Sequence, residues 1–590
     1  GLFSEVSENY LTERPPWAGL WVNYGRISPD EKGNTLTPYT NYIAGETNKP
    51  RWMDIEATKG DFDFSIIGDA LKRAKEYGTY YYYEFWAGDR CPEWLFAEGV
   101  PRVRLQRARN APYFLDPYFQ ERQILFFQEM ADYLAALPED LRERLAFIQP
   151  GFGSTGDRQL YKGPPSDPRY AIDSTEYVKY MQAMTVGLME AFARHPETAN
   201  IRFLWNLDDY IPGPVNPDDY RNDELLGEAL YAQWMYENYY CQLRKQQFTL
   251  AIGYMNPDER NRDRVQRPFF FGTAPDAPAN GHPNYVRGEH NDQKWAETPM
   301  AQKALKWHYY WTAISSVDRG LDSWETHIHY LKTDRFLQAY QFSHQYAFHK
   351  NPATSPRAFV ALRDGLDYTD FERFPMSEYG DGQFNTVGAE SRIEKILAEY
   401  AAYGARNDDM EAAVGRVGSD YVLRSRGLND CVSNIIARNY RRFMQQIAPN
   451  ETSVGHWRVG PKEQPYGRFA RGFEAASGKN AMYFELDDDF FAPDGKLAGR
   501  YPVKVRIVYF DENKGGEWEL RYDAVGNPDQ SARIIKKSDS GTAPTWREVT
   551  LTLKDANFGK RGPRGSDFSI HNVDNKDDLF HLVEIIRDRN

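Results

Sequence analysis

A strand–helix–strand unit near the middle of the chain most constrains the fold. Tyr285–Gly288 is typical of a short strand that ends by presenting Glu289, and Leu321–His327 is typical of the next strand. Between them, Thr298–Val317 carries apolar and aromatic residues at the spacing of a helix with one face in a core. Two strands joined by a helix predict parallel pairing, and a barrel of such units gathers its strand ends around one mouth.

The same alternation runs through roughly the first 350 residues. Further strands are predicted at residues 17–24, 79–86, 145–149, 201–207 and 248–254, and further helices at 66–77, 119–137, 177–194, 223–247 and 333–348. With the unit above, this pattern fits eight βα repeats. We therefore predict an α/β fold, a (β/α)8 TIM barrel spanning residues 1–350.

The pattern of predicted helices and strands changes after residue 350. Residues 351–455 predict a mixed, partly helical connecting region packed on the barrel, with helices at 390–403 and 432–447. Residues 456–590 hold short alternating runs at 481–486, 503–509, 518–523, 546–553 and 581–587, separated by Gly, Pro, Asp and Asn. Such spacing predicts a C-terminal antiparallel β-sandwich domain.

Composition excludes several classes of protein. The net charge of −13 argues against nucleic acid as a partner. The three cysteines are widely spaced, without a metal-ligand or disulfide pattern. No run approaches 18 apolar residues, so we expect no membrane span. Aromatic residues make up 15% of the chain. This share suits both a large hydrophobic core and the stacking of aromatic rings on sugar rings. The chain opens on Gly1 without a signal peptide, and we expect that any targeting segment has been removed.

Two motifs resemble one enzyme clan. The run Arg51-Trp-x-x-Ile-Glu-x-x-x-Gly-x-Phe-Asp-Phe-Ser65 closely resembles the second-strand segment of clan A glycoside hydrolases, especially family 42-like β-galactosidases. Cys91-Pro-Glu-Trp-Leu95 is similar to the Pro-x-Trp-Leu that follows their third strand. The resemblance implies a retaining mechanism, with a proton donor after strand four and a nucleophile at the end of strand seven.

The resemblance places Glu289, in Arg-Gly-Glu-His, on the nucleophile position. The strand-four position carries Gly153-Ser-Thr-Gly-Asp157, where some relatives carry Gly-x-Trp-Gly-Glu, so Asp157 is the matching carboxylate. Asp is one methylene shorter than Glu; either the loop moves inward or another residue donates the proton. Glu289 could instead lie in a solvated polar loop, and Asp157 could cap a helix or a turn. Glu325 is the reserve candidate for either role.

Other residues at the predicted strand ends are candidates for substrate binding. Trp324 would form the floor of the sugar subsite, or belong to the core. Asn206 and Glu84 would hold sugar hydroxyls, or serve the structure. The full set of substrate-binding candidates is Trp324, Glu325, Asn206, Glu84, Trp86, Arg102, Arg104, Arg262, His290 and His327.

Arginines gather in two predicted mouth loops. Arg102 and Arg104 stand with two more arginines after strand three, and Arg262 with three more after strand six. Because guanidinium groups bind oxyanions in a bidentate manner, the loops indicate a substrate that carries sulfate or carboxylate groups. The alternative is that these arginines pair with neighbouring Asp and Glu. With the Arg loops, the barrel is most similar to the exo-β-carrageenase group, glycoside hydrolase family 167.

We predict no cofactor and no metal. His327 and His329 lack a third ligand, so hydrogen bonding is the preferred role, and Glu485–Asp489 is either a Ca²⁺ site or an exposed acidic turn. No nucleophile elbow, phosphate loop or dinucleotide fingerprint is present. The sequence thus predicts a secreted or periplasmic, exo-acting retaining glycosidase for a galactan-type, sulfated algal polysaccharide or oligosaccharide. Three alternatives remain open: a non-catalytic carbohydrate-binding barrel, an inverting enzyme, and a nucleophile at Glu325.

Overall fold

The fold is that of a computed structural model. It describes residues 11, 13–23, 25–27, 41–106, 110–156, 158–206, 222–238, 242–245, 271, 285–290, 305–363, 366, 370–380, 387–405, 438–491, 502–541 and 543–587. The chain forms two compact units. The first comprises Gly1–Phe248, Asn261–Asn291 and Leu321–Asp334, and the second Thr249–Arg260, Asp292–Gly320 and Arg335–Asn590.

The first unit is built on an eight-stranded parallel sheet. Its strands are β1 (Gly19–Asn23), β2 (Ile43–Asn48), β3 (Tyr80–Glu84), β6 (Leu145–Gln149), β7 (Leu204–Asn206), β8 (Gln242–Lys245), β9 (Val286–His290) and β10 (Ser323–His327). They pair in the order β6-β3-β2-β1-β10-β9-β8-β7, parallel at every step. The two outer strands of this order, β6 and β7, meet through a parallel bridge between Ile148 and Phe203. The sheet therefore closes on itself.

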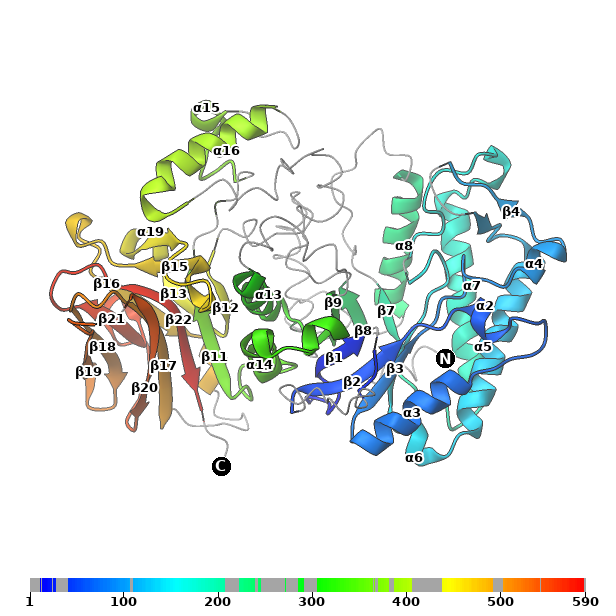
Figure 1. The fold of residues 1–590 in the computed structure, drawn as a ribbon, viewed down its shortest axis with the longest axis horizontal. Coiled ribbons are helices and arrows are strands. Elements are labelled where there is room, and N and C mark those ends of the chain that lie inside the picture. Colours follow the sequence, from blue (N-terminus) through cyan, green and yellow to red (C-terminus); the bar gives the residue numbers. More distant parts are fainter. Residues whose placement is uncertain are drawn as a thin grey trace. The chain divides into compact units, whose positions relative to one another are not determined.

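Within this unit, described helices follow four of these strands. They are α3 (Ser65–Tyr77) after β2, α5 (Pro117–Ala136) after β3, α7 (Ser174–Ala193) after β6 and α8 (Asn222–Asn238) after β7 (Figure 1). Shorter elements of this unit are α2 (Trp52–Ile55), α4 (Trp94–Ala97), α6 (Glu139–Arg142) and the ribbon β4 (Arg102–Val103) with β5 (Ala111–Pro112). Local signals set the helix ends: Asp116 caps α5 through the Phe119 amide, and α3 stops at Gly78 with φ 67°.

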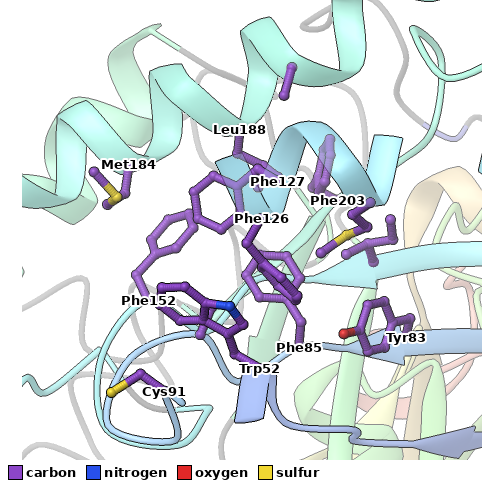
Figure 2. Close-up of a cluster of buried hydrophobic side chains, with 14 of the residues drawn as sticks. Trp52, Tyr83, Phe85, Cys91, Phe126, Phe127, Phe152, Met184, Leu188 and Phe203 are labelled. Carbon is purple, nitrogen blue, oxygen red and sulfur yellow. The ribbon is translucent and has the colours of Figure 1, made fainter. Parts of the chain in front are cut away.

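An aromatic cluster joins the helices to the outside of the sheet (Figure 2). Phe85, which follows β3, lies 5.5 Å from Phe127 of α5 between ring centroids, and Phe127 lies 5.5 Å from Phe152 after β6. Trp52 of α2 packs on Phe126 at 5.6 Å. These side chains are almost fully buried, so the core lies between the sheet and α3, α5 and α7.

The second unit contains two antiparallel sheets. One has the order β12-β11-β22-β15-β14 with β17 bonded to β22 and β20, and the other has the order β13-β16-β21-β18-β19. The strands are β11 (Arg357–Ala361), β12 (Tyr440–Arg442), β13 (Met444–Ile447), β14 (Val454–Trp457), β15 (Phe469–Gly472), β16 (Ala481–Leu486), β17 (Val503–Asp511), β18 (Glu517–Ala524), β19 (Asn527–Lys536), β20 (Thr545–Leu553), β21 (Phe568–Asn572) and β22 (Leu579–Ile586). Val505 and Phe580 of the first sheet share one hydrophobic cluster with Phe484 and Trp518 of the second.

The second unit also holds helices. The helices are α13 (Leu305–Arg319), α14 (Leu337–Tyr346), α15 (Met376–Tyr379), α16 (Val387–Tyr400) and α19 (Pro449–Thr452). The division places α13 and α14 in this unit, and its strands begin at Arg357. The segments 1–350, 351–455 and 456–590 stay predictions.

Three local predictions are corrected. The helix predicted at 223–247 ends at Asn238 and is followed by a sixth strand at Gln242–Lys245. The strand predicted at 248–254 lies outside the described residues. The helix predicted at 432–447 is wrong over its described part, which forms β12 and β13. There Tyr440, Arg442 and Met444 are buried in alternation, and Phe443 has φ 61°. The second strand is Ile43–Asn48, before the motif quoted for it.

Candidate active site

An aromatic layer fills the interior of the closed sheet. The ring of Tyr82 (β3) stacks on that of Phe147 (β6) at 4.6 Å, and Trp21 (β1) meets Tyr82 at 5.2 Å. Tyr285, just before β9, meets Trp17 at 4.7 Å and Phe147 at 5.9 Å. The layer is fully buried, so the interior is a packed core rather than a channel.

Polar residues stand two positions further along the same strands. Glu84 follows Tyr82, Gln149 follows Phe147, and Arg287 follows Tyr285. Because strand side chains alternate between faces with a period of two, these residues continue inward at the carboxyl ends of their strands. The interior therefore changes from aromatic to charged toward the end where parallel barrels carry their active sites.

The charged residues form one buried network. Glu325 of β10 accepts hydrogen bonds from the Tyr82 hydroxyl and from the Arg287 guanidinium on one oxygen, and from Lys49 Nζ at 2.9 Å on the other. Lys49 Nζ also lies 3.5 Å from Glu84 Oε2. We call Lys49, Glu84, Gln149, Arg287 and Glu325 the charge network.

Neutral partners complete the charge network. Gln149 receives the Arg287 Nη1–H at 2.8 Å on its side-chain oxygen and donates its amide to Glu84. Trp86 Nε1 donates to the second oxygen of Glu84 at 3.2 Å. Two carboxylates thus face two cations in a site with almost no solvent access, which is the arrangement that buried charges require.

Glu289 belongs to the same rim by its backbone position. It lies two residues after Arg287 on β9 and is in register with Glu325 on the neighbouring β10. Asn206 is the last residue of β7 and His290 the last of β9. The side chains of Glu289, Asn206 and His290 lie outside the described part of the structure.

Asp157 itself lies outside the described residues, but the loop that leads to it is placed. The Ala87 amide donates to the Gly151 carbonyl at 2.9 Å, and the Asp89 amide donates to Gly153 at 3.0 Å, so the loop after β6 packs on the loop after β3. A Cβ added at Gly156 would lie 3.0 Å from Glu84 Oε1. The residue preceding Asp157 therefore touches the charge network.

Trp324 and His327 occupy different sides of β10. Trp324 is almost fully buried, and since it precedes Glu325 it lies on the opposite face of the strand, away from the charge network. His327 lies two residues beyond Glu325, half-buried, with its ring 6.4 Å from that of Tyr330. The structure thus brings Glu84, Trp86 and Glu325 together and does not bring Trp324 to them.

The arginine loops are only partly described. Arg102 is exposed, pairs with Glu93, and places its guanidinium 3.9 Å from the centre of the Phe96 ring. Arg104 is exposed and its carbonyl accepts from the Ser166 amide at 2.8 Å. Arg262 lies outside the described residues.

Sequence reasoning missed Lys49, Gln149 and Arg287. Lys49 follows a strand whose position was not predicted, whereas the other two were within reach. Gln149 ends the predicted strand four, and Arg287 precedes Glu289 by two residues. A period-two reading of the strands from their aromatic residues would have found both.

The described residues show neither a metal cluster nor a membrane-spanning helix. Across the described ranges, no three His, Cys, Asp or Glu side chains gather closely enough to hold a metal ion. Among the described helices, none combines the length and apolar character needed to cross a bilayer.

Comparison with known proteins gives no family. No family model matches the chain, and no curated protein matches it. Solved structures share partial likeness. The catalytic domain of β-amylase from Paenibacillus polymyxa is 12% identical, over 52% of this chain and 91% of that one, with a TM-score of 0.34.

Two further structures show a similar degree of likeness. A β-galactosidase from Halorubrum lacusprofundi is 13% identical over 56% of this chain and 58% of that one, with a TM-score of 0.34. Xylanase B from Clostridium stercorarium F9 is 13% identical over 55% of this chain and 87% of that one, with a TM-score of 0.30. Scores this low carry no argument about fold or activity.

Proposed function

We propose that the chain is a retaining glycoside hydrolase with a (β/α)8 barrel and an accessory β-sandwich. The substrate is a galactan-type, sulfated algal polysaccharide of the carrageenan, agar or porphyran class, or an oligosaccharide from it, cleaved at β-galactosidic linkages from a chain end. The proposed relatives are the family 42-like clan A enzymes and the exo-β-carrageenase group. Because a polysaccharide cannot cross a membrane unaided, the proposed location is outside the cytoplasm.

One observation carries the proposal: the backbone at Glu289 and the described residue before Asp157 both lie close to the charge network. Glu289 is in register with Glu325, and Gly156, beside Asp157, approaches Glu84. Both Glu84 and Glu325 belong to the charge network, so chain segments far apart in sequence meet at one rim. A retaining glycosidase needs two carboxyl groups about 5–5.5 Å apart.

The mechanism follows from these positions. Asp157 donates a proton to the glycosidic oxygen while the Glu289 carboxylate bonds to the anomeric carbon and the bond to the leaving sugar breaks. Water, deprotonated by Asp157, then attacks the same carbon and releases Glu289. Arg287 precedes the nucleophile on β9, and its bonds to Glu325 and Gln149 hold that strand in place.

Glu325 suits a supporting role better than a chemical one. Its two oxygens accept from Lys49, Tyr82 and Arg287, and it is 0% exposed. A nucleophile must reach an anomeric carbon, and an acid must carry a proton that it can give away. A carboxylate held by two cations is suited to neither task.

Azide rescue tests the assignment directly. We expect Glu289→Gly and Asp157→Gly each to lower kcat by at least about a hundredfold on a β-galactoside with a good leaving group. Azide should restore turnover in both, giving the α-glycosyl azide with Glu289→Gly and the β-glycosyl azide with Asp157→Gly. Glu325→Gln, the control within the charge network, should not be rescued.

Three outcomes would contradict the proposal. An α-azide from a small-side-chain variant at Glu325 would move the nucleophile there. A wild-type product of inverted configuration by NMR would make the enzyme inverting. Saccharide binding without turnover, with unchanged affinity in Glu289→Gln, would leave a carbohydrate-binding protein.

A further inference from the structure

A cavity of about 780 Å³ lies beside the charge network, within the first unit. Its walls come from the ends of β1 and β2, from the first half of α3 and from Trp86 after β3. Lys49 and Trp86 line it and also contact Glu84, at 3.5 and 3.2 Å. The inner end of the cavity is therefore the edge of the charge network.

The other end of the cavity reaches the surface on α3. Ile66, in the first turn of this helix, lines the cavity and is 42% exposed. Arg26 after β1 and Lys72 on α3 line it as well, and both are exposed. A ligand that occupied the cavity would extend from the proposed catalytic rim to solvent, with one indole and one aliphatic side chain along its path.

The cavity carries a local excess of positive charge. Its lining holds four cationic side chains (Arg26, Lys49, Lys72, Arg73) and two carboxylates (Glu46, Asp69), in a chain whose net charge is −13. Arg73 Nε donates to Glu46 at 2.8 Å, and Lys49 is held in the charge network. Among the described residues, Arg26 and Lys72 form no ion pair.

Arg26 and Glu46 both line the cavity, and the charge of Arg26 acts on the Glu46 carboxylate. Burial raises the pKa of Glu46, while Arg73, Arg26 and the Ile27 amide lower it, so the Arg26 guanidinium is within electrostatic reach of this carboxylate. Cations that line a concave, partly enclosed site concentrate the field and attract anions. By contrast, Arg102 in the loop after β3 is already paired with Glu93.

We infer that this cavity binds a negatively charged sugar unit of the substrate and that Arg26 and Lys72 are its specificity-determining residues. The inference rests on the proposed function and assigns its anion preference to the cavity. The ligand group is an oxyanion on a sugar, either a sulfate ester or a carboxylate. Arg26 supplies a planar fork that matches two oxygens, and Lys72 supplies a point charge.

The test compares paired substrates that differ in charge. Wild type, the double variant Arg26→Gln/Lys72→Gln and the control Lys75→Gln are assayed on a sulfated oligosaccharide, its desulfated form and a uronate-bearing one. Lys75 lies on the same helix but pairs with Asp140 and does not line the cavity. Losing charge-assisted hydrogen bonds should lower kcat/KM on the charged substrate about 10- to 100-fold relative to the neutral one.

The same measurements distinguish sulfate esters from carboxylates, and repeating them at higher salt tests the role of charge. A loss confined to the sulfated substrate assigns the cavity to sulfate esters, and a loss confined to the uronate assigns it to carboxylates. Salt should weaken the wild-type preference for charged substrate more than that of the double variant. Lys75→Gln should keep the wild-type preference. An unchanged charged-to-neutral ratio in the double variant, or equal rates of wild type on all three substrates, overturns the inference.

A failure of the proposed function has a different signature. If wild type turns over no glycoside, the same three oligosaccharides are compared by calorimetric binding, with inorganic sulfate as a further ligand. A charge preference in wild type that is lost in the double variant supports the cavity assignment without catalysis. Equal binding of all three by wild type, or the same preference in both proteins, overturns it.

Discussion

At the scale of single residues, a period of two organises the interior of the closed sheet. Tyr82 belongs to the aromatic layer, and Glu84, one inward position later, belongs to the charge network. The change from apolar to charged takes about 7 Å of strand rise, so the charged side chains lie directly against the buried aromatic layer. Lys49 and Arg287 then balance Glu84 and Glu325, because all four side chains are at most 7% exposed.

The first prediction concerns this balance. Glu325→Ala leaves Lys49 and Arg287 buried without their shared carboxylate, so we expect the free energy of unfolding to fall by about 3–5 kcal/mol. Urea unfolding followed by fluorescence measures it. The control Glu325→Ala/Lys49→Met restores the charge balance and should recover part of the loss. A single-variant loss below about 1 kcal/mol would show that the charge network is not tightly coupled.

The second prediction concerns pH. Burial raises the pKa of Asp567 to about 6, although the amides of Leu486 and Lys560 bind its oxygens at 2.8 and 3.0 Å. A carboxyl whose folded pKa is raised stabilises the fold when protonated, and this contribution is lost as pH rises through about 6. Wild type should therefore lose up to about 3 kcal/mol between pH 4 and 7 from this group.

The variant Asp567→Asn isolates that contribution. It cannot ionise, so its stability relative to wild type should improve as pH rises from 4 to 7. Other titrating groups cancel when the two proteins are compared at each pH. Urea unfolding at pH 4.5 and 7.5 measures the difference, and equal pH dependence in the two proteins would contradict the assignment.

At the scale of elements, strands with strong patterns were predicted and weak ones were not. The four tyrosines of β3 and the apolar run of β6 are recognisable from sequence alone. The run Ile-Ala-Gly-Glu-Thr-Asn of β2 has little apolar character, and it is a strand because β1 and β3 flank it on both sides. Pairing between distant segments supplies what the local sequence lacks.

The motif that carried the resemblance has a structural role of its own. Glu56 is buried, accepts from Trp52 Nε1 at 3.0 Å and from the Gly60 amide at 2.8 Å, and pairs with Arg122 of α5. Through these contacts, the residues of the motif hold the turn after β2 against α5. Such a motif predicts the architecture of the loop, whereas the charge network depended on residues such as Lys49 and Gln149 that no motif included.

The third prediction concerns the loops after β3 and β6. A Cβ at Gly88 would lie 1.9 Å from the Gly153 carbonyl oxygen, a clash that only backbone movement relieves. Gly88→Ala should separate the two loops, displace Asp157 and lower kcat/KM at least about tenfold, with a stability loss of about 1–3 kcal/mol. Kinetics with urea unfolding separates the two effects.

Gly526 provides the matched control. A Cβ at this glycine would meet nothing within 4 Å, so Gly526→Ala should change neither activity nor stability measurably. Wild-type activity in Gly88→Ala would show that the loop contact does not position the proposed acid. A fall in activity without loss of stability would show that it does so without supporting the fold.

At the scale of the whole molecule, the chain is not partitioned in sequence order. The segment between β9 and β10 contains α13, which belongs to the second unit. Within that unit, Trp307 Nε1 donates to the Gln464 carbonyl at 2.9 Å and Trp311 Nε1 to the Pro465 carbonyl at 2.9 Å. A helix predicted from its apolar face as a barrel helix thus has hydrogen-bond partners more than 150 residues later.

The fourth prediction follows from this partition. A fragment ending at residue 350, the expected barrel boundary, keeps α13 but removes Gln464, Pro465 and the other residues that bury its tryptophans. We expect this fragment to unfold without a cooperative transition and to bind a hydrophobic dye, whereas the full chain unfolds cooperatively. In the full chain, Trp311→Ala should cost about 3–5 kcal/mol, because its ring is buried and its N–H is bonded. Calorimetry measures both. Cooperative unfolding of the fragment at the temperature of the full chain would mean that residues 1–350 fold on their own and that the contacts of α13 with the rest of its unit are dispensable.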